Sequence, residues 1–250
     1  MLILEKKKHG IVFRTIWYAE QRVERKGINL YRYAGFHIDQ PYKAIRTLVS
    51  SLEEDEDKIL SRISKNGRYE IRRAEKEGII CEIKIGVEIA NEDIEHFAEF
   101  FCEFWRSKGI RGKSKTEYTK EIEKYVNAGN FAISSARMGE KILVYHTYIV
   151  GEDFVRLFQS ASQFRTEEEI PRQLVGMANR LLHKEDMFAF KRVGKKIYDW
   201  GGAGTREEVA SITKFKESFG GIPKELYEWE ESIGIKERIV KGIINVLQKF

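Results

Sequence analysis

Hydrophobic and polar residues alternate over the first forty positions of the chain, as they do in β-strands that are buried on one face. One alternating segment covers residues 11–16, and a second covers residues 28–33 after the break at Gly27. Because successive side chains of a strand point to opposite faces, this spacing predicts two or three strands near the N-terminus.

Apolar residues between Pro41 and Gly78 recur every three or four positions instead, which is the spacing of an amphipathic helix. The dipeptide Asn66-Gly67 predicts a break in this helical region. Residues 69–76 then predict a short basic helix, which either faces solvent or binds an anionic acceptor such as a sugar diphosphate. The cations in and beside this helix are Arg68, Arg72, Arg73 and Lys76.

From residue 79 onwards, strand patterns and helix patterns follow one another. The predicted strands cover residues 79–85, 130–136, 141–150, 152–159, 196–200 and 223–231. The predicted helices begin near Asn91, Ser114, Pro171, Arg206 and residue 235, and the helix at Pro171 is expected to reach about His183. This order predicts an α+β fold in which a mixed central sheet is flanked by helices, with residues 1–78 and 79–250 as separate units.

Composition excludes a disordered chain, because 42% of the 250 residues are hydrophobic and 12% are aromatic. The formal net charge is +5 and the pI is about 9.0. Basic and acidic residues are nevertheless interleaved, whereas a dedicated nucleic-acid binder usually concentrates its basic residues on one face. Composition therefore leaves a nonenzymatic module that binds RNA or another anion as an alternative to an enzyme.

Neither cysteine belongs to a metal-binding or redox motif. Cys81 and Cys102 have no CxxC partner and no histidine at zinc-ligand spacing, so we expect free, buried thiols and no metal. No window reaches the roughly 20 apolar residues that span a bilayer, and the first residues lack the apolar core of a signal peptide. We therefore expect a cytoplasmic protein without a transmembrane segment.

Three segments of the chain resemble one protein family. Residues 198–202 (YDWGG) followed by residues 215–221 (FKESFGG) are similar to the closing signature of Fem-type aminoacyl- and acyltransferases. Residues 65–76 are similar to the basic helix of that family's first domain, and residues 159–162 with 181–183 also fit. The resemblance implies a GNAT-like acyltransferase fold over residues 79–250, preceded at residues 1–78 by a truncated second copy.

The same resemblance implies an activity. It indicates an N-acyltransferase that moves an acyl group from an activated donor to an amine acceptor. It favours acyl-CoA as the donor, with aminoacyl-tRNA as the alternative. The acceptor is expected to be a small molecule or a lipid- or nucleotide-linked sugar, such as a cell-wall or surface-glycan precursor.

Donor-binding residues are expected around the helix that begins at Pro171. The segment from Gln173 through Gly176 to Ala178 is similar to the Gln/Arg-x-x-Gly-x-Gly/Ala pattern with which GNAT enzymes hold the coenzyme A pyrophosphate. Free N–H groups and the positive end of a helix favour an anion. Gly176 lies inside the predicted helix, however, so it either contacts the donor or allows close helix packing. Arg165 and Arg172 flank the helix start and are expected to bind phosphate.

Two further donor-binding candidates and three catalytic candidates remain. Gly201 and Gly202 permit close approach of a ligand to the backbone, or they form a plain turn. Lys216 is the preferred cation for a donor phosphate or for the oxyanion of the tetrahedral intermediate. Amine acylation also needs a base, and the two candidates are His146 and Asp199. Each has a structural alternative: His146 as a buried histidine, and Asp199 as an Asx-type anchor of the glycine turn.

Overall fold

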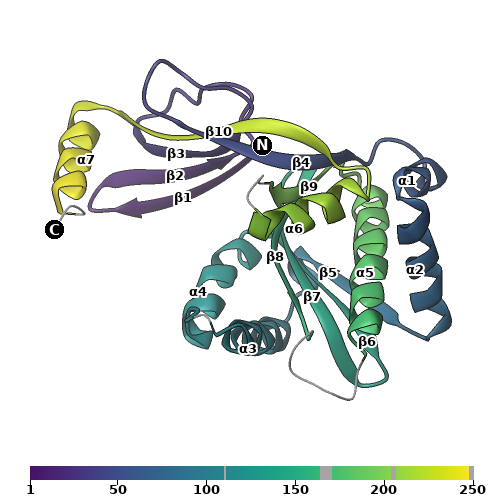
Figure 1. Cartoon of the computed structure of the whole chain (residues 1–250). Helices are drawn as coiled ribbons and strands as arrows, with labels where there is room; N and C mark the ends of the chain where they lie inside the picture. Colours follow the sequence, from purple (N-terminus) through teal and green to yellow (C-terminus); the bar gives the residue numbers. More distant parts are fainter. Residues whose placement is uncertain (110, 164–170, 204–206, 248–250) are drawn as a thin grey trace. The chain divides into compact units, whose positions relative to one another are not determined.

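The computed structural model describes residues 1–109, 111–163, 171–203 and 207–247 (Figure 1). The chain forms two compact units. Unit 1 comprises residues 1–47, 202–204 and 223–250, and unit 2 comprises residues 48–201 and 205–222.

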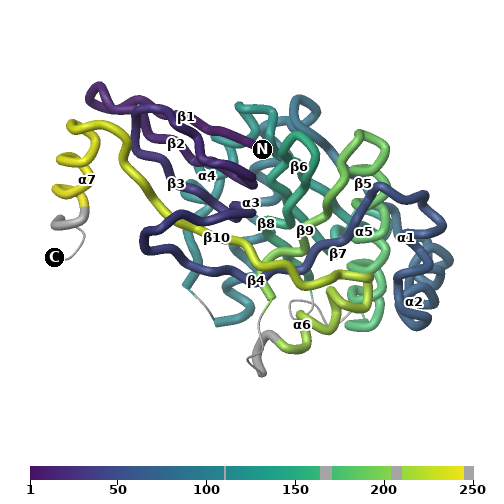
Figure 2. The backbone as a smooth tube through the Cα atoms, turned by 90° about the horizontal axis from the view of Figure 1, so that it is seen from above, coloured from purple at the N-terminus to yellow at the C-terminus, as the bar shows by residue number. Residues whose placement is uncertain are grey.

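Unit 1 contains, among its described residues, a sheet and one helix. Its strands are β1 (Leu2–Lys8), β2 (Ile11–Trp17), β3 (Gly27–Ala34), the first part of β4 (Lys43–Ser51) and β10 (Ile222–Ile233), and its helix is α7 (Ile235–Leu247). The order is β1-β2-β3-β10, and β2 pairs with β1 antiparallel and with β3 parallel (Figure 2). The strands predicted over residues 11–16 and 28–33 are confirmed as β2 and β3.

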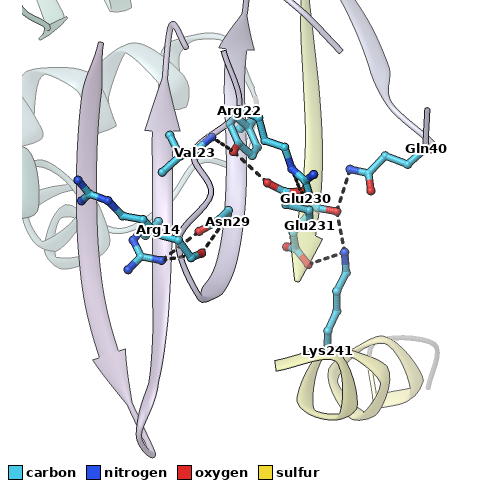
Figure 3. Close-up of polar contacts among 10 residues, drawn as sticks. Arg14, Arg22, Val23, Asn29, Gln40, Glu230, Glu231 and Lys241 are labelled. Carbon is cyan, nitrogen blue, oxygen red and sulfur yellow. Dashed lines mark hydrogen bonds and ion pairs between the residues drawn. The ribbon is translucent and has the colours of Figure 1, made fainter. Parts of the chain in front are cut away.

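The core of unit 1 is built on Tyr31 of β3, whose ring stacks on Trp229 of β10 with 4.3 Å between the ring centroids. The hydroxyl of Tyr31 donates to Glu231 Oε1 at 2.9 Å and accepts from the N–H of Val23 at 2.8 Å. Arg22 forms an ion pair with the same buried carboxylate (Figure 3). Burial raises the pKa of Tyr31 to about 12, so the phenol remains a donor to Glu231 at neutral pH.

Unit 2 is a mixed sheet with helices on both faces. Its strands are the second part of β4 (Lys43–Ser51), β5 (Ile80–Ile85), β6 (Phe131–Met138), β7 (Lys141–Val150), β8 (Phe154–Ser162) and β9 (Ile197–Gly202). Its helices are α1 (Glu56–Arg62), α2 (Lys65–Lys76), a short 3-10 helix (Gly86–Glu88), α3 (Asn91–Ser107), α4 (Lys115–Val126), α5 (Arg172–Arg192) and α6 (Glu207–Glu217). Figure 1 shows α5 and α2 on one face of this sheet and α3 and α4 on the other. The predicted α+β class, with a mixed sheet flanked by helices, is confirmed.

The sheet of unit 2 runs in the order β4-β9-β8-β7-β6-β5. β5 to β8 are antiparallel neighbours, whereas β8 and β9 are parallel. α5 crosses the sheet as its longest helix, and it extends to Arg192 rather than ending near His183 as predicted. Its buried residues follow one another closely because the helix is covered by the sheet on one side and by α2 on another.

The helical prediction for residues 41–78 is wrong in its first part. Residues 43–51 form the strand β4. A short apolar run fits a buried strand as well as a helix, and here pairing with neighbouring strands selects the strand. Asn66-Gly67 does not break the helix either. Ser64 caps α2 by accepting a hydrogen bond from the N–H of Gly67 at 3.1 Å, and a Cβ atom at Gly67 would lie 2.8 Å from the Ile63 side chain.

The compact units differ from the predicted segments 1–78 and 79–250. α1 and α2 belong to unit 2, while β10 and α7 belong to unit 1. Strand pairing causes this difference, since β10 joins β3 through the pairs Trp229↔Tyr31 and Glu231↔Asn29, which lie about 200 positions apart in the sequence. A truncated second copy at the N-terminus stays a prediction.

Candidate active site

Two parallel strands of unit 2 separate beside a cavity. β8 and β9 pair from Phe154↔Ile197 to Arg156↔Asp199, and the pairing ends there although both strands continue. A cavity of about 730 Å³ adjoins the unpaired parts of the two strands. It is lined by Leu157, Ser160 and Ser162 of β8, Trp200 of β9, Phe104 and Ser107 of α3, Lys108, Arg172, Asn179 and His183 of α5, and Ser211, Ile212, Phe215 and Lys216 of α6. This volume is typical of a small-molecule site.

Lys216 places a cation in the wall of this cavity. Its side chain is only 8% exposed. Burial lowers the pKa of its ammonium group to about 8, with Asp199 opposing and Arg156 reinforcing the shift. Its Nζ atom lies 3.8 Å from the position that a Cβ atom of Gly201 would occupy, so the lysine and the glycine turn adjoin each other.

Asp199 anchors that turn. Its Oδ1 atom accepts the N–H of Gly201 at 2.7 Å, and its Oδ2 atom accepts from Arg156 Nη1 at 2.7 Å. The side chain is fully buried and does not line the cavity. The geometry therefore favours the anchor over the base as the role of Asp199.

The two candidate glycines differ. Gly201 is buried and has a φ angle of +78°, a conformation that side chains with a Cβ atom rarely adopt. Gly202 is exposed, and a Cβ atom there would meet no described atom within 4 Å. It also belongs to unit 1, so we place only Gly201 at the site.

His146 is buried behind the cavity wall. Its Nδ1 atom lies 2.8 Å from Asp186 Oδ2, and its Nε2 atom lies 2.9 Å from Asn179 Oδ1. Of these three residues only Asn179 lines the cavity. The ring of His146 is fully buried and does not line this cavity. The alternative of a buried histidine with satisfied polar atoms describes it better than the role of base.

A chain of buried hydrogen bonds leads from Asp186 to a second histidine. The hydroxyl of Tyr148 donates to Asp186 Oδ2 at 2.5 Å, and its oxygen lies 2.7 Å from the hydroxyl of Tyr198. With an ionised Asp186 as the final acceptor, the hydroxyl of Tyr198 donates to the oxygen of Tyr148. The oxygen of Tyr198 in turn accepts from Nδ1 of His183 at 2.9 Å. Burial raises the pKa of both phenols well above the usual value, so both keep their hydroxyl hydrogens.

His183 was not among the bases proposed from the sequence. With Asp186 as the final acceptor of the chain, the order of donors assigns the hydrogen of His183 to Nδ1 and leaves Nε2 as an acceptor. His183 lines the cavity, and Nε2 makes no hydrogen bond within the described residues. Burial lowers the pKa of His183 well below its usual value, with His146, Lys216 and Arg180 acting in the same direction, so the ring is neutral at physiological pH.

The expected donor-binding residues lie at the start of α5. Arg172 is its first residue and lines the cavity, whereas Gln173 and Gly176 line an adjoining hollow of about 350 Å³ together with Arg172. Gly176 lies in the second turn of α5, where its N–H belongs to the helical hydrogen bonds and is not free for a pyrophosphate. Arg165 lies outside the described residues.

The basic helix α2 packs beside α5, and acidic residues of α2 pair with cations of α5. Glu70 forms an ion pair with Arg180, and Glu75 Oε1 lies 2.7 Å from Lys184 Nζ. Arg68 donates to the main-chain oxygens of Ser61 and Ile63 at the end of α1. Part of the charge in this region therefore holds the two helices together.

A metal is not required to explain the polar cluster. Potential ligand atoms of His146, His183 and Asp186 lie within 4.8 Å of one another among the described residues. The Nδ1 atoms of the two histidines are already hydrogen bonded to Asp186 and Tyr198.

Cys81 and Cys102 are free thiols, as predicted, but both are half-buried rather than buried.

The mixed sheet of unit 2, with parallel strands that separate beside a cavity and helices on both faces, is a Fem/GNAT-like fold, as the sequence motifs predicted. FemX has the same fold with a TM-score of 0.60 and 12% sequence identity, over 80% of this chain and 63% of the FemX chain. This chain thus spans less than two thirds of FemX.

Two further solved structures match almost the whole chain. The C-terminal domain of an Agrobacterium fabrum protein described as a lysylphosphatidylglycerol synthetase is 11% identical, with a TM-score of 0.56 over 98% of this chain and 85% of that one. L-PGS from Bacillus licheniformis is 12% identical, with a TM-score of 0.53 over the same shares. No family model and no curated protein matches the sequence. Within the described part of the chain, no helix has the length and apolar character needed to cross a membrane.

Proposed function

We propose that this protein is an N-acyltransferase, which transfers an acyl or aminoacyl group from an activated donor to an amine. The observation that carries the proposal is that Lys216 and His183 line one cavity where β8 and β9 separate. Direct attack of an amine on an acyl carbon needs a cation for the oxyanion and an acceptor for the amine proton. These two residues supply one group of each kind.

The transfer then follows in one addition and one elimination. The amine nitrogen forms a bond to the acyl carbon, and the ammonium of Lys216 stabilises the negative oxygen of the tetrahedral intermediate. Nε2 of His183 accepts the proton that the amine loses. The bond from the acyl carbon to the carrier then breaks, and Nε2 of His183 returns the proton to the departing sulfur or oxygen atom of the carrier.

Two donor classes share the chemistry that the site recognises, which is an activated acyl carbon on a phosphate-bearing carrier: acyl-CoA and aminoacyl-tRNA. Arg172 and Lys216 supply positive charge for the phosphates of either carrier. The position of Gly176 inside α5 removes the specific support for coenzyme A. The name lysylphosphatidylglycerol synthetase denotes synthesis of an aminoacylated lipid, which supports testing the aminoacyl donor equally. The proposed acceptor remains an amine on a small molecule or on a lipid- or nucleotide-linked sugar, such as a precursor of cell wall or surface glycan.

The deciding experiment offers acetyl-CoA and aminoacyl-tRNA in separate arms to a panel of small amines and amino sugars, with N-acylated products detected by mass spectrometry. Lys216→Met and His183→Gln should each lower kcat about 100-fold or more. The matched controls are Lys214→Met and His96→Gln, which change exposed residues of α6 and α3. Full transfer by both site variants would refute the proposal. Salt-dependent RNA retention without transfer from either donor would favour the binding module instead.

Tyr198 is proposed as a positioning residue, because it acts on substrate only through the tautomer of His183. Tyr198→Phe removes the oxygen that accepts from Nδ1, so the hydrogen can move to Nε2 and block the base. We expect kcat to fall about tenfold while KM stays constant. A rise in KM with unchanged kcat would assign Tyr198 to packing alone.

A further inference from the structure

One face of α7 in unit 1 exposes apolar side chains in a regular row. Ile235 is 80% exposed, Ile239 is 60% exposed and Ile243 is 54% exposed. Residues four positions apart lie above one another on a helix, so these three form a single stripe along α7. Isolated exposed isoleucines are common, but a stripe of three on one helix face indicates a surface that is covered in use.

The edges of the isoleucine stripe are basic. At about 100° per residue, Lys236 falls on one side of the stripe and Arg238 on the other, and both are exposed. Glu237 is the one acidic residue in the sequence of α7, and it is buried. The outward face of the helix is therefore apolar in the middle and positively charged at both edges.

The opposite side of α7 is fixed to its own unit. Lys241 donates to the main-chain oxygen of Glu230 in β10 at 2.8 Å, and its Nζ atom lies 3.3 Å from Glu230 Oε1 (Figure 3). Because the helix is held through this side, the stripe is left available to a partner outside unit 1.

A second basic segment lies beside the start of α7. Lys236 Nζ lies 3.3 Å from the position that a Cβ atom of Gly10 would occupy, so the turn between β1 and β2 adjoins the helix. That turn follows the run Lys6-Lys7-Lys8, whose side chains are all exposed. Positive charge thus continues from the edges of the stripe onto β1.

We propose that α7 lies on the surface of an anionic lipid bilayer, with its isoleucine stripe in the interface and its flanking cations at the lipid phosphates. A narrow apolar stripe with basic edges is the pattern of an interfacial helix. Lysines near an anionic leaflet add to the attraction. Two copies paired through parallel α7 helices would place Lys236 and Arg238 against like charges, and a nucleic acid would leave the isoleucines in water. This inference does not depend on the proposed transferase activity.

The test is flotation of the full chain with vesicles of phosphatidylcholine that contain about 30% phosphatidylglycerol, compared with pure phosphatidylcholine. We expect binding to the anionic vesicles only, weakened by salt. Ile239→Asp should reduce the bound fraction about tenfold or more, and Lys236→Glu should reduce it roughly fivefold or more. Ile243→Trp should strengthen binding, since Trp favours the interface. The control is Val87→Asp, an equally severe change at a residue that is 98% exposed on another element.

Three results would overturn the inference. Equal binding of Ile239→Asp and the native protein would show that the stripe is not involved, provided that circular dichroism shows an unchanged fold. No flotation of either the native protein or Ile243→Trp would exclude a lipid surface. A dimer in light scattering that Ile239→Asp dissociates, without vesicle binding, would assign the stripe to a second copy.

Discussion

Replacing Lys216 with methionine should stabilise the protein at neutral pH while it lowers kcat about 100-fold or more. In the folded protein burial lowers the pKa of Lys216 from 10.5 to about 8, whereas the unfolded chain keeps the ordinary value. At pH 7 the lysine is protonated in both states, and the folded state then bears the cost of a buried cation. A pKa lowered from 10.5 to about 8, at about 1.4 kcal/mol for each tenfold change in proton affinity, gives an upper bound of about 3.5 kcal/mol and about 3 kcal/mol at pH 7.

The sign of the pH dependence follows from the direction of the shift. A pKa that is lowered on folding means that the unfolded chain binds more protons between about pH 8 and pH 10.5, so the stability of the native protein rises with pH in this window. The advantage of Lys216→Met should therefore fall from about 3 kcal/mol at pH 7 to about 2 at pH 9 and under about 1 at pH 10.

Urea unfolding of both proteins at pH 7, 8, 9 and 10 measures this difference directly. For a chain of this size, about 3 kcal/mol also corresponds to a rise in Tm of roughly 6 to 12 °C. Lys214→Met is the control, because Lys214 is exposed on the same helix and should change stability by less than about 0.5 kcal/mol. The reasoning is refuted if Lys216→Met is less stable than the native protein at pH 7, or if the difference does not shrink above pH 8.

Three further changes test the surroundings of the site. Gly201→Ala should lower the free energy of unfolding by about 1 to 2 kcal/mol, because Gly201 has a positive φ angle. Gly202→Ala should change it by less than about 0.5 kcal/mol. Equal effects of the two variants in urea unfolding would contradict this prediction. Arg156→Met removes the guanidinium group that pairs with the buried carboxylate of Asp199 and should cost about 3 to 5 kcal/mol; adding Asp199→Asn should recover part of the loss in the same assay. Asp186→Asn should lower the free energy of unfolding by about 1 to 3 kcal/mol, because it weakens the buried hydrogen bonds to His146 and Tyr148. An unchanged free energy of unfolding would show that these hydrogen bonds do not stabilise the fold.

The sequence determined the elements whose signal is local. Alternation predicted β2 and β3, and the cap at Ser114 predicted α4, where Ser114 Oγ accepts from the N–H of Glu117. The motifs around residues 198–202 and 215–221 predicted the fold and directed attention to Lys216, which lies in the cavity wall. These predictions succeeded because periodicity, caps and glycine turns act over a few neighbouring residues.

The tertiary structure decided everything that depends on distant pairing. β4 is a strand because it lies next to β9 in the sheet. Trp200 Nε1 donates to Ser50 Oγ at 2.9 Å, although the two residues lie 150 positions apart in the sequence. The choice between His146 and His183 also lay beyond the sequence, since both are histidines in apolar segments. Only the fold places one ring behind the wall and the other in it, and only the chain through Tyr198 fixes which nitrogen carries the hydrogen. Burial and hydrogen bonding are properties of neighbours in space, and local sequence does not contain them.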